Sequence, residues 1–470
     1  MANNGETHLA FTGNAYLEHR VSVHHRKAGF QKLIALLKSS DLSFANLECG
    51  IQAGEDWPAF GPGMGWAGTH MGAPPRMIEE LKFMGIGAVY AANNHAGDFA
   101  EAGVLTTIKY LKRGDMPYAG IGASLTEASL PAYLETENAR VALICAADWG
   151  PRGQMDLPFP WPAGYMPADE LPPYKSRPGI NLLRYDSAIH VDRKAFDEIR
   201  RVSEALNWGR GKKVRFSGAS RTEPLIGTTL RGWELDTDTQ FFFMGRKFVL
   251  DTAFHASTFP FQEDLDRIYK HVQEARRNAD VVIVALHDQS HGVAVHDYIN
   301  TFAHGAIDAG ADVYINHGGL QRGIEIYKGK AIFYGQPPLY LQNNEVTQLP
   351  AAMKLRLGLK MDSTAGELIE QRTRTRERAA TEGGEIHLFA GIGSCVHTTV
   401  FGDNAELKEI RIFPTEETVI HGRRPRRSVP QLAEPGSEKF NMVIERVRER
   451  SKSFGTEIEV RDGMGVIRVK

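Results

Sequence analysis

The chain has 470 residues, with 55 Lys plus Arg against 57 Asp plus Glu and a formal net charge of −2. Hydrophobic residues make up 42% and charged residues 24%, which are globular proportions that exclude wholesale disorder, a collagen-like chain and a disulfide-rich miniprotein. A near-neutral chain has no overall field that recruits polyanions, so we expect no nucleic-acid partner.

The cysteines and the N-terminus indicate a compartment. Cys49, Cys145 and Cys395 are widely separated, so we expect buried thiols and neither a disulfide framework nor a metal knuckle. The N-terminus has no basic segment followed by an apolar one, and no uncharged apolar stretch reaches the ~18 residues of a membrane span. We therefore expect a cytoplasmic protein without a membrane span.

The first 145 residues alternate short apolar runs with helical patterns, which predicts a βαβ layered sheet. The predicted strands are 9–12, 42–45, 88–91 and 141–145, and the predicted helices are 29–38, 77–84 and one that places Val104, Ile108 and Leu111 on a single face.

The periodicity weakens over residues 149–260, which we interpret as an insertion over a cleft, with one helix at 193–206. Aromatic residues there and in an earlier loop could form a lid over a peptide-like group: Trp57, Phe60, Trp66, Trp149, Phe159 and Trp161.

The sheet pattern then returns. The predicted elements are helices 264–277 and 297–309, strands 281–286 and 313–315, a polar excursion at 339–385, strands 386–389, 397–400 and 407–412, and a C-terminal helix at 438–450 with a closing hairpin. We expect an α/β domain over 1–420, with insertions at about 149–260 and 339–385. A basic linker, helix and hairpin over 421–470 would pack on it.

Polar residues stand at the carboxyl ends of five predicted strands. They are Gly13-Asn14, Asn46-Leu47-Glu48, Asn93-Asn94-His95, His287-Asp288 and Asn316-His317. Ligands of open α/β sheets bind beyond these ends, so we expect the side chains to share one pocket. Asn, Glu and His can bind a cation or move a proton, which favours a metal or acid–base site.

On these motifs the chain resembles the CapA (poly-gamma-glutamate synthesis) proteins of the metallophosphatase superfamily. The matching segments, in family order, are Phe11-Thr12-Gly13-Asn14, Asn46-Leu47-Glu48, Ala92-Asn93-Asn94-His95, Tyr118-Ala119-Gly120-Ile121-Gly122, the strand ending in His287, 307–312 before His317, and Gly323-Ile324-Glu325-Ile326-Tyr327. The resemblance implies a four-layered α/β/β/α sandwich with a metal site at the strand ends.

The resemblance also implies roles for individual residues. One or two divalent ions (Mn, Zn, Mg or Fe) would be held by Asn14, Glu48, Asn94, His287 and His317. His95 would be the general acid, and Glu48 a metal-binding or bridging carboxylate. His291, four residues after His287, has no family match and is a further catalytic candidate.

Two departures from the family pattern bear on the metal. Asn14 stands where the family has its first Asp, and His317-Gly318-Gly319 shortens a His-Pro-His segment, so one imidazole is missing. Glu48 is the matched carboxylate. We therefore expect one weakly held ion or none, unless Asp98 or Asp288 turns inward.

Three functions remain open. The first is metal-dependent hydrolysis of an amide-linked (poly-gamma-glutamate or peptide-like) or phosphoryl substrate in capsule biosynthesis. The second assumes that the missing ligands leave the site without a metal. His and Glu would then epimerise an amino-acid Cα by proton transfer, as in the lasso-peptide epimerases that resemble this family. The third is a non-catalytic binding module in polymer or natural-product assembly. The substrate would be peptide-like or a small molecule.

Overall fold

The computed structural model describes residues 5–58, 70–150, 166–170, 175–206, 236–244, 246–288, 294–318, 320–342, 354–355, 357–371, 394–421 and 427–469. Two large mixed β-sheets dominate this part of the chain.

The first sheet joins the N-terminal strands to the C-terminal ones. Its order is β23 (Glu459–Arg461), β24 (Met464–Arg468), β21 (Leu407–His421), β20 (Ser394–Phe401), β1 (Thr7–Tyr16), β2 (Leu42–Leu47), β5 (Ala88–Tyr90) and β6 (Tyr118–Ala119), with β19 (Tyr340–Leu341) on β1 and β22 (Arg427–Leu432) on β21. Strands β1, β2, β5 and β6 run parallel, and β20 pairs antiparallel to β1. The carboxyl ends of four neighbouring strands therefore lie on one edge.

The second sheet has a parallel centre. Its order is β12 (Gln240–Phe243), β13 (Arg246–Leu250), β11 (Leu182–Val191), β9 (Arg140–Trp149), β15 (Val281–His287), β16 (Val313–His317), β18 (Lys330–Gln336) and β17 (Gly323–Tyr327), with β14 (His255–Pro260) on β11 and β8 (Ala132–Glu135) on β9. Two short pairs complete the strands: β3 (Gly50–Ile51) with β4 (Gly72–Ala73), and β7 (Ile121–Gly122) with β10 (Gly179–Ile180).

Strand β15 shows how the layers form, because all of its residues are buried. Val281 and Ile283 belong to the core that also contains Phe11 and Phe44 of the first sheet, so the two sheets pack face to face. Val282 and Val284 belong to a second core with the helices α7 (Gln262–Asn278) and α8 (Asp297–Asp308). A strand buried on both faces needs an unbroken apolar sequence, which is what 281–286 offers.

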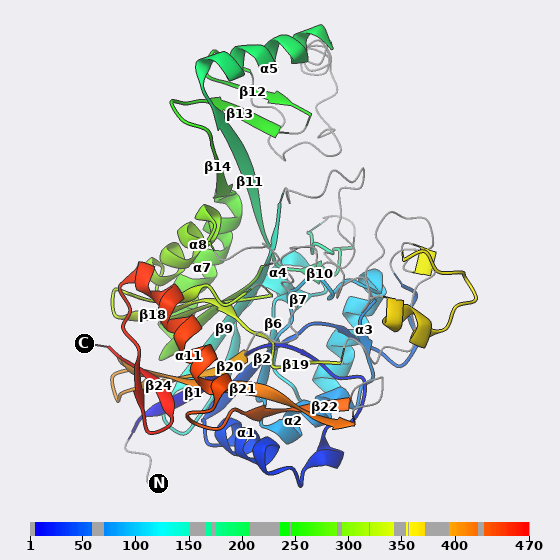
Figure 1. Ribbon diagram of the computed structural model, residues 1–470, viewed down its shortest axis with the longest axis vertical. Helices are drawn as coiled ribbons and strands as arrows, with labels where there is room; N and C mark the ends of the chain where they lie inside the picture. The colour runs from blue at the N-terminus through cyan, green and yellow to red at the C-terminus, as the bar shows by residue number, and fades with distance from the viewer. Residues whose placement is uncertain are drawn as a thin grey trace.

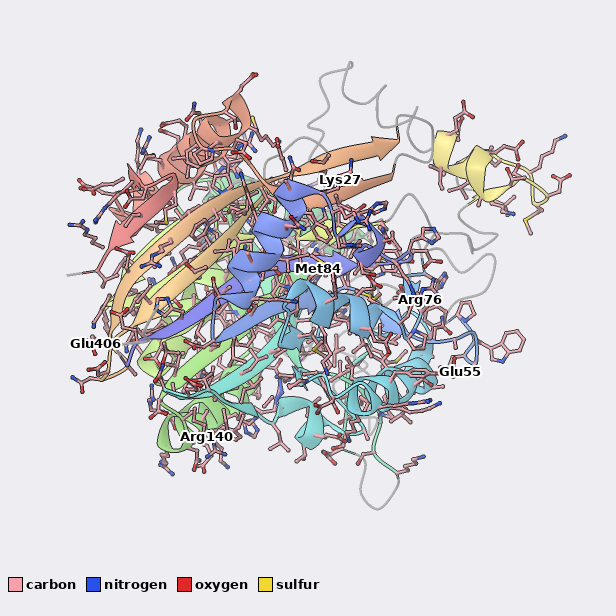
Figure 2. The ribbon with its side chains drawn as sticks, turned by 90° about the horizontal axis from the view of Figure 1, so that it is seen from below. Lys27, Glu55, Arg76, Met84, Arg140 and Glu406 are labelled. Carbon is pink, nitrogen blue, oxygen red and sulfur yellow. The ribbon has the colours of Figure 1, made fainter. Side chains whose placement is uncertain are left out.

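Helices pack against the strands. They are α1 (Ala28–Lys38), α2 (Met77–Met84), α3 (Ala100–Arg113), α4 (Leu125–Ser129), α5 (Arg193–Ala205), α7 (Gln262–Asn278), α8 (Asp297–Asp308) and α11 (Glu438–Ser451), with 3-10 turns η1 (Ser22–His24) and η2 (Lys452–Phe454). Figure 2 shows α1, which begins after Lys27, beside α2, which ends at Met84, across strands of the first sheet.

An arm projects from this body (Figure 1). It consists of the far halves of β11 and β14 with β12, β13 and α5, and it has a small core of its own built on Phe196, Phe241 and Phe243. The sequence predicted a helix here and a cover over a cleft. The helix is confirmed, and the far part of the insertion is a stranded arm that extends away from the body, whereas β10 (Gly179–Ile180) pairs with β7 of the body. The cover over a cleft stays a prediction.

Most of the other predicted elements are confirmed, with strands that run longer than expected: β1 and β9 each have ten residues. Tertiary pairing extends a strand beyond its apolar run. The predicted strand 386–389 and the basic linker at 422–426 lie outside the described residues. The closing hairpin is β23 and β24, which joins the first sheet through β21 and does not merely pack on it. The division at residue 420 stays a prediction.

The three cysteines are buried and free. No helix in the described ranges combines the length and apolarity that a bilayer crossing requires.

Candidate active site

Strands of both sheets bring the predicted polar residues to one place. Asn14 of β1 lies opposite Asn46 of β2 in register, and His287 of β15 lies opposite His317 of β16. Glu48 follows β2 directly, and Asn94 and His95 follow β5 after a short connection. Side-chain contacts between Glu48, Asn94 and His287 join the two sheets, so side chains from separate strand ends meet in one cluster, the candidate pocket.

Three candidate ligands meet at one nitrogen of His287. The Oδ1 of Asn94 lies 2.9 Å from His287 Nε2, and the Oε1 of Glu48 lies 3.8 Å from the same atom. His287 and Glu48 are buried, whereas Asn94 is partly exposed. The cluster is therefore reached from the Asn94 side.

His317 lies on the other side of the His287 ring. Its Nδ1 is 3.1 Å from His287 Nδ1, and the ring of Tyr90 stacks on it with centroids 5.0 Å apart. Burial lowers the pKa of His317 to about 3, so its imidazole is neutral at physiological pH. The structure thus separates His317 from the Glu48 and Asn94 oxygens, because the two ring nitrogens of His287 face opposite ways.

Hydrogen bonds join the buried side chains of Asn14, Asn46 and Asn93 beside the Glu48–Asn94–His287 cluster. Asn46 donates from Nδ2 to Asn14 Oδ1 at 2.9 Å, and Asn93 donates to Asn46 Oδ1 at 3.2 Å. Asn93 Oδ1 in turn accepts the backbone N–H of His95 at 3.0 Å. The Oδ1 of Asn14, the atom that would bind a metal, is therefore used to hold Asn46.

His95 is oriented by a carboxylate. Its Nδ1 lies 2.7 Å from Asp98 Oδ2, which also accepts the backbone N–H of Met71 at 2.7 Å. The His95 side chain is 16% exposed and that of Asp98 2%, so the imidazole is partly accessible to solvent and its partner is buried. Asp98 does turn inward, but toward His95. Holding one ring nitrogen fixes the tautomer and aims the other.

His70 is a neighbour that the sequence did not predict. It is buried, and neither ring nitrogen has a hydrogen-bond partner among the described residues. Burial lowers its pKa, while the charge of Asp98 acts in the opposite direction. His70 is a single His after a Gly-rich segment, and no sequence pattern there indicates a functional residue.

Asp288 does not reach the site. Its Oδ2 accepts from Arg322 Nη1 at 2.6 Å, and its Oδ1 accepts from the Tyr298 hydroxyl at 3.2 Å. The same hydroxyl lies 2.6 Å from Asp148 Oδ2, so its single proton is shared between the two carboxylates, with the shorter contact to Asp148. Asp288 is thus part of a buried ion-pair network, which no local sequence motif predicts.

Other predicted residues cannot be placed. His291, Gly319, Phe60, Trp66, Phe159 and Trp161 lie outside the described residues. Of the remaining lid candidates, Trp57 is 87% exposed, and Trp149 ends β9 and packs against the main core.

Glu48 has the most informative ionisation. Burial raises the pKa of its carboxyl to about 7 from an ordinary 4.5, against opposing effects of the His95 imidazole and a hydrogen bond from Asn14. The proton is therefore bound more tightly in the folded chain than in the unfolded one. The stability from this protonation is complete below pH ~4.5 and is lost as the pH rises through ~7.

Glu48→Gln should remove this pH dependence. We expect the free energy of unfolding of the variant, relative to the wild type, to rise by about 3 kcal/mol between pH 4.5 and pH 8. Urea unfolding in the presence of a chelator measures it, because a bound cation would change the ionisation. The exposed Glu457→Gln is the control, and a Glu48→Gln difference as flat as that of the control would contradict the assignment.

The donors fit a single divalent ion better than a pair. An ion with bonds of ~2.0–2.2 Å holds neighbouring ligands about 3 Å apart. Asn94 Oδ1 lies at that separation, 2.9 Å from His287 Nε2, and Glu48 Oε1, at 3.8 Å, would have to move closer. A second ion would need another anion, and among the described residues Asp98 and Asp288 are committed to His95 and Arg322. The two-ion centre that the resemblance implied does not fit these residues.

Comparison with known proteins places the chain in context. The family model described as "Bacterial capsule synthesis protein PGA_cap" matches residues 8–336, a range that contains every residue of the pocket. Two similar proteins of Sinorhizobium fredii, "Uncharacterized protein y4sH" and "Uncharacterized protein y4uA", are each 29% identical over 456 residues, which cover 95% of this chain and 89% of theirs.

Proposed function

The chain belongs to the bacterial capsule synthesis PGA_cap family, and from that membership and the pocket we propose that it is a hydrolase of an amide-linked, peptide-like substrate that uses one divalent ion. The family resemblance drawn from the motifs is thereby confirmed, whereas substrate and reaction are our proposal. The four-layered metallophosphatase sandwich is part of it, supported by the two facing sheets and the helices α7 and α8 outside the second.

The convergence of Asn94 and Glu48 on His287 Nε2 carries the proposal. These three residues would hold the ion, which when bound lowers the pKa of a water ligand and polarises a carbonyl. Glu48 brings the negative charge, and Asn14 keeps its carboxylate in place by a hydrogen bond. Asn94 adds a neutral oxygen at the partly exposed side, where the substrate would enter.

His95 would supply the proton for the leaving group. The Asp98 carboxylate fixes the Nδ1 side of the ring, and the backbone contact with Asn93 fixes its main chain. An imidazole held in this way can protonate a departing amine at neutral pH without searching for its orientation. Asp98 is then a positioning residue, since it acts through His95.

One observation favours a second candidate, epimerisation at Cα without a metal. The pKa of Glu48 is about 7, and its carboxyl lies near the His95 imidazole, so two acid–base side chains are close together. Inversion of a stereocentre needs one such group to remove the proton and another to return it on the opposite face.

One probe separates these functions. Poly-γ-L-glutamate is incubated with the full-length chain and Mn²⁺ in heavy water, with and without chelator, alongside p-nitrophenyl phosphate for the phosphoryl class. Hydrolysis predicts shorter chains and new amino groups that disappear with chelator. Epimerisation predicts deuterium at Cα and D-glutamate without shortening. If neither product forms and the polymer only binds, the chain is a binding module and the proposed hydrolysis is wrong for this polymer.

A further inference from the structure

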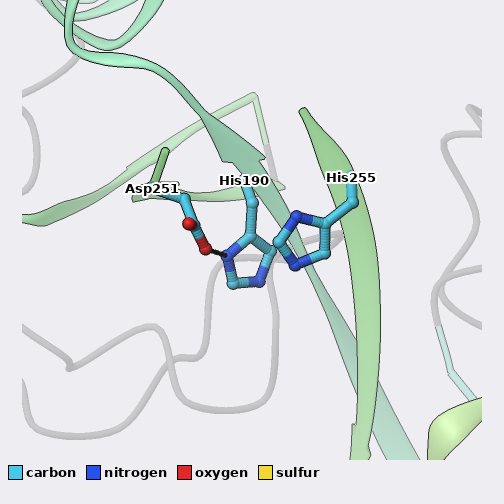
Figure 3. A group of neighbouring side chains, drawn as sticks. All are labelled: His190, Asp251 and His255. Atoms are coloured by element: carbon cyan, nitrogen blue, oxygen red, sulfur yellow. Dashed lines mark hydrogen bonds and ion pairs between the residues drawn. The ribbon is translucent and has the colours of Figure 1, made fainter. Parts of the chain in front are cut away.

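The arm carries a cluster of possible metal ligands that the pocket does not use. His190 of β11 pairs in register with His255 of β14, and β13 runs parallel to β11 on its other side. Asp251 directly follows β13, and its backbone N–H bonds to the carbonyl of Val191 at 2.8 Å. Three strands thus deliver two imidazoles and a carboxylate to one point (Figure 3).

The distances suit one small ion after minor side-chain rotations. One ligand atom from each of the three residues lies within 4.8 Å of the others, and His190 Nδ1 is 3.0 Å from Asp251 Oδ2. A tetrahedral Zn²⁺ with bonds of ~2.0–2.1 Å separates its ligands by about 3.3 Å. The rings of His190 and His255 stack at 4.0 Å, so His255 must turn toward Asp251. Because His255 is exposed, it can make that rotation by giving up its stacking on His190.

The surrounding contacts match those of metal ligands. His190 Nε2 lies 2.8 Å from the Ser257 hydroxyl, which fixes the ring and leaves Nδ1 for the ion. Asp251 Oδ1 accepts from the Thr252 backbone and hydroxyl, which leaves Oδ2 facing His190. The Asp251 side chain is 34% exposed, so water can complete the coordination.

We propose that His190, Asp251 and His255 bind one Zn²⁺-class cation that ties together β11, β13 and β14 of the arm. Two imidazoles and a carboxylate are ligands that Zn²⁺ favours over Mg²⁺ or Ca²⁺. The ion would be structural, because it would join β11, β13 and β14 in an arm whose own core is small. The proposal does not depend on the reaction in the pocket.

Zinc titration of the full-length chain tests it. We expect His255→Ala and Asp251→Asn each to lose one equivalent of Zn²⁺ relative to the wild type, or to bind it at least about tenfold more weakly. Ser257→Ala should weaken the same equivalent without removing a ligand. Hydrogen exchange of residues 246–260 should slow on addition of Zn²⁺ in the wild type and not in the two ligand variants.

Two controls isolate the arm from the pocket. His287→Ala should keep the arm equivalent, and His8→Ala, which changes a surface imidazole outside both clusters, should bind as the wild type does. Circular dichroism in chelator shows whether each variant is folded. If folded His255→Ala and Asp251→Asn bind as much Zn²⁺ as the wild type, with equal affinity, the arm site does not exist, and the proposed hydrolase is unaffected.

Discussion

His95→Gln should lower the turnover of poly-γ-glutamate hydrolysis by about 10²–10⁴-fold, the contribution of a well-placed general acid. Gln can neither carry the positive charge nor give up a proton near neutrality. Because His95 would act on the leaving group and not hold the ion, KM and the bound metal should change little. Steady-state kinetics and metal analysis of the same preparation measure both quantities.

Two further variants show whether the loss is chemical. His25→Gln changes an exposed His that contacts its own turn, and it should retain full activity. Asp98→Asn should lower kcat less than His95→Gln does, with KM unchanged, since it releases the ring without removing it. Wild-type turnover in folded His95→Gln would show that another group supplies the proton.

Arg322→Met should destabilise the fold by about 3–5 kcal/mol, the usual effect of removing one partner from a buried ion pair. Arg322 and Asp288 both have fully buried side chains, with Nη1 2.6 Å from Oδ2. Met fills much of the Arg volume but leaves the Asp288 carboxylate without its cation. Urea unfolding at pH 7 measures the change in the free energy of unfolding.

The matched control is Lys328→Met, which breaks the 2.6 Å pair with Asp308 on the surface. Water replaces the lost partner there, so the free energy of unfolding should change far less. Equal effects of Arg322→Met and Lys328→Met on the free energy of unfolding would mean that Asp288 gains another partner or a proton with little loss of stability. The buried network would then not hold the end of β15.

The convergence of the strand-end side chains was largely predictable because the carboxyl ends of parallel strands share one edge of a sheet. Glu48, His95 and His287 each follow or end an apolar strand, and parallel strands put such residues on one edge whatever their separation in the chain. The order of the family motifs supported the same fold. Helices with clear periodicity, such as α3 with Val104, Ile108 and Leu111 buried, were predicted for a similar reason.

Features that depend on distant partners were not predictable. Nothing near Asp288 in the sequence indicates that Arg322 will draw it away from the pocket, since the pair forms only when β15 and the segment before β17 meet. Asn94 contacts Nε2 of His287 and His317 contacts Nδ1. Which nitrogen faces which residue depends on the orientation of the ring, and the spacing of residues in the sequence does not determine it. The arm escaped prediction because β11 obtains its partners, β13 and β14, from residues more than fifty positions later.

Manganese binding tests the central claim most directly: that His287, Glu48 and Asn94 hold one divalent ion. The measurement is a Mn²⁺ titration followed by electron paramagnetic resonance, made on chains that also carry His255→Ala so that the arm cannot contribute. The account predicts one Mn²⁺ per chain, lost on adding either His287→Ala or Glu48→Gln and kept with His95→Gln. Unchanged Mn²⁺ binding after both His287→Ala and Glu48→Gln, in folded protein, would contradict it.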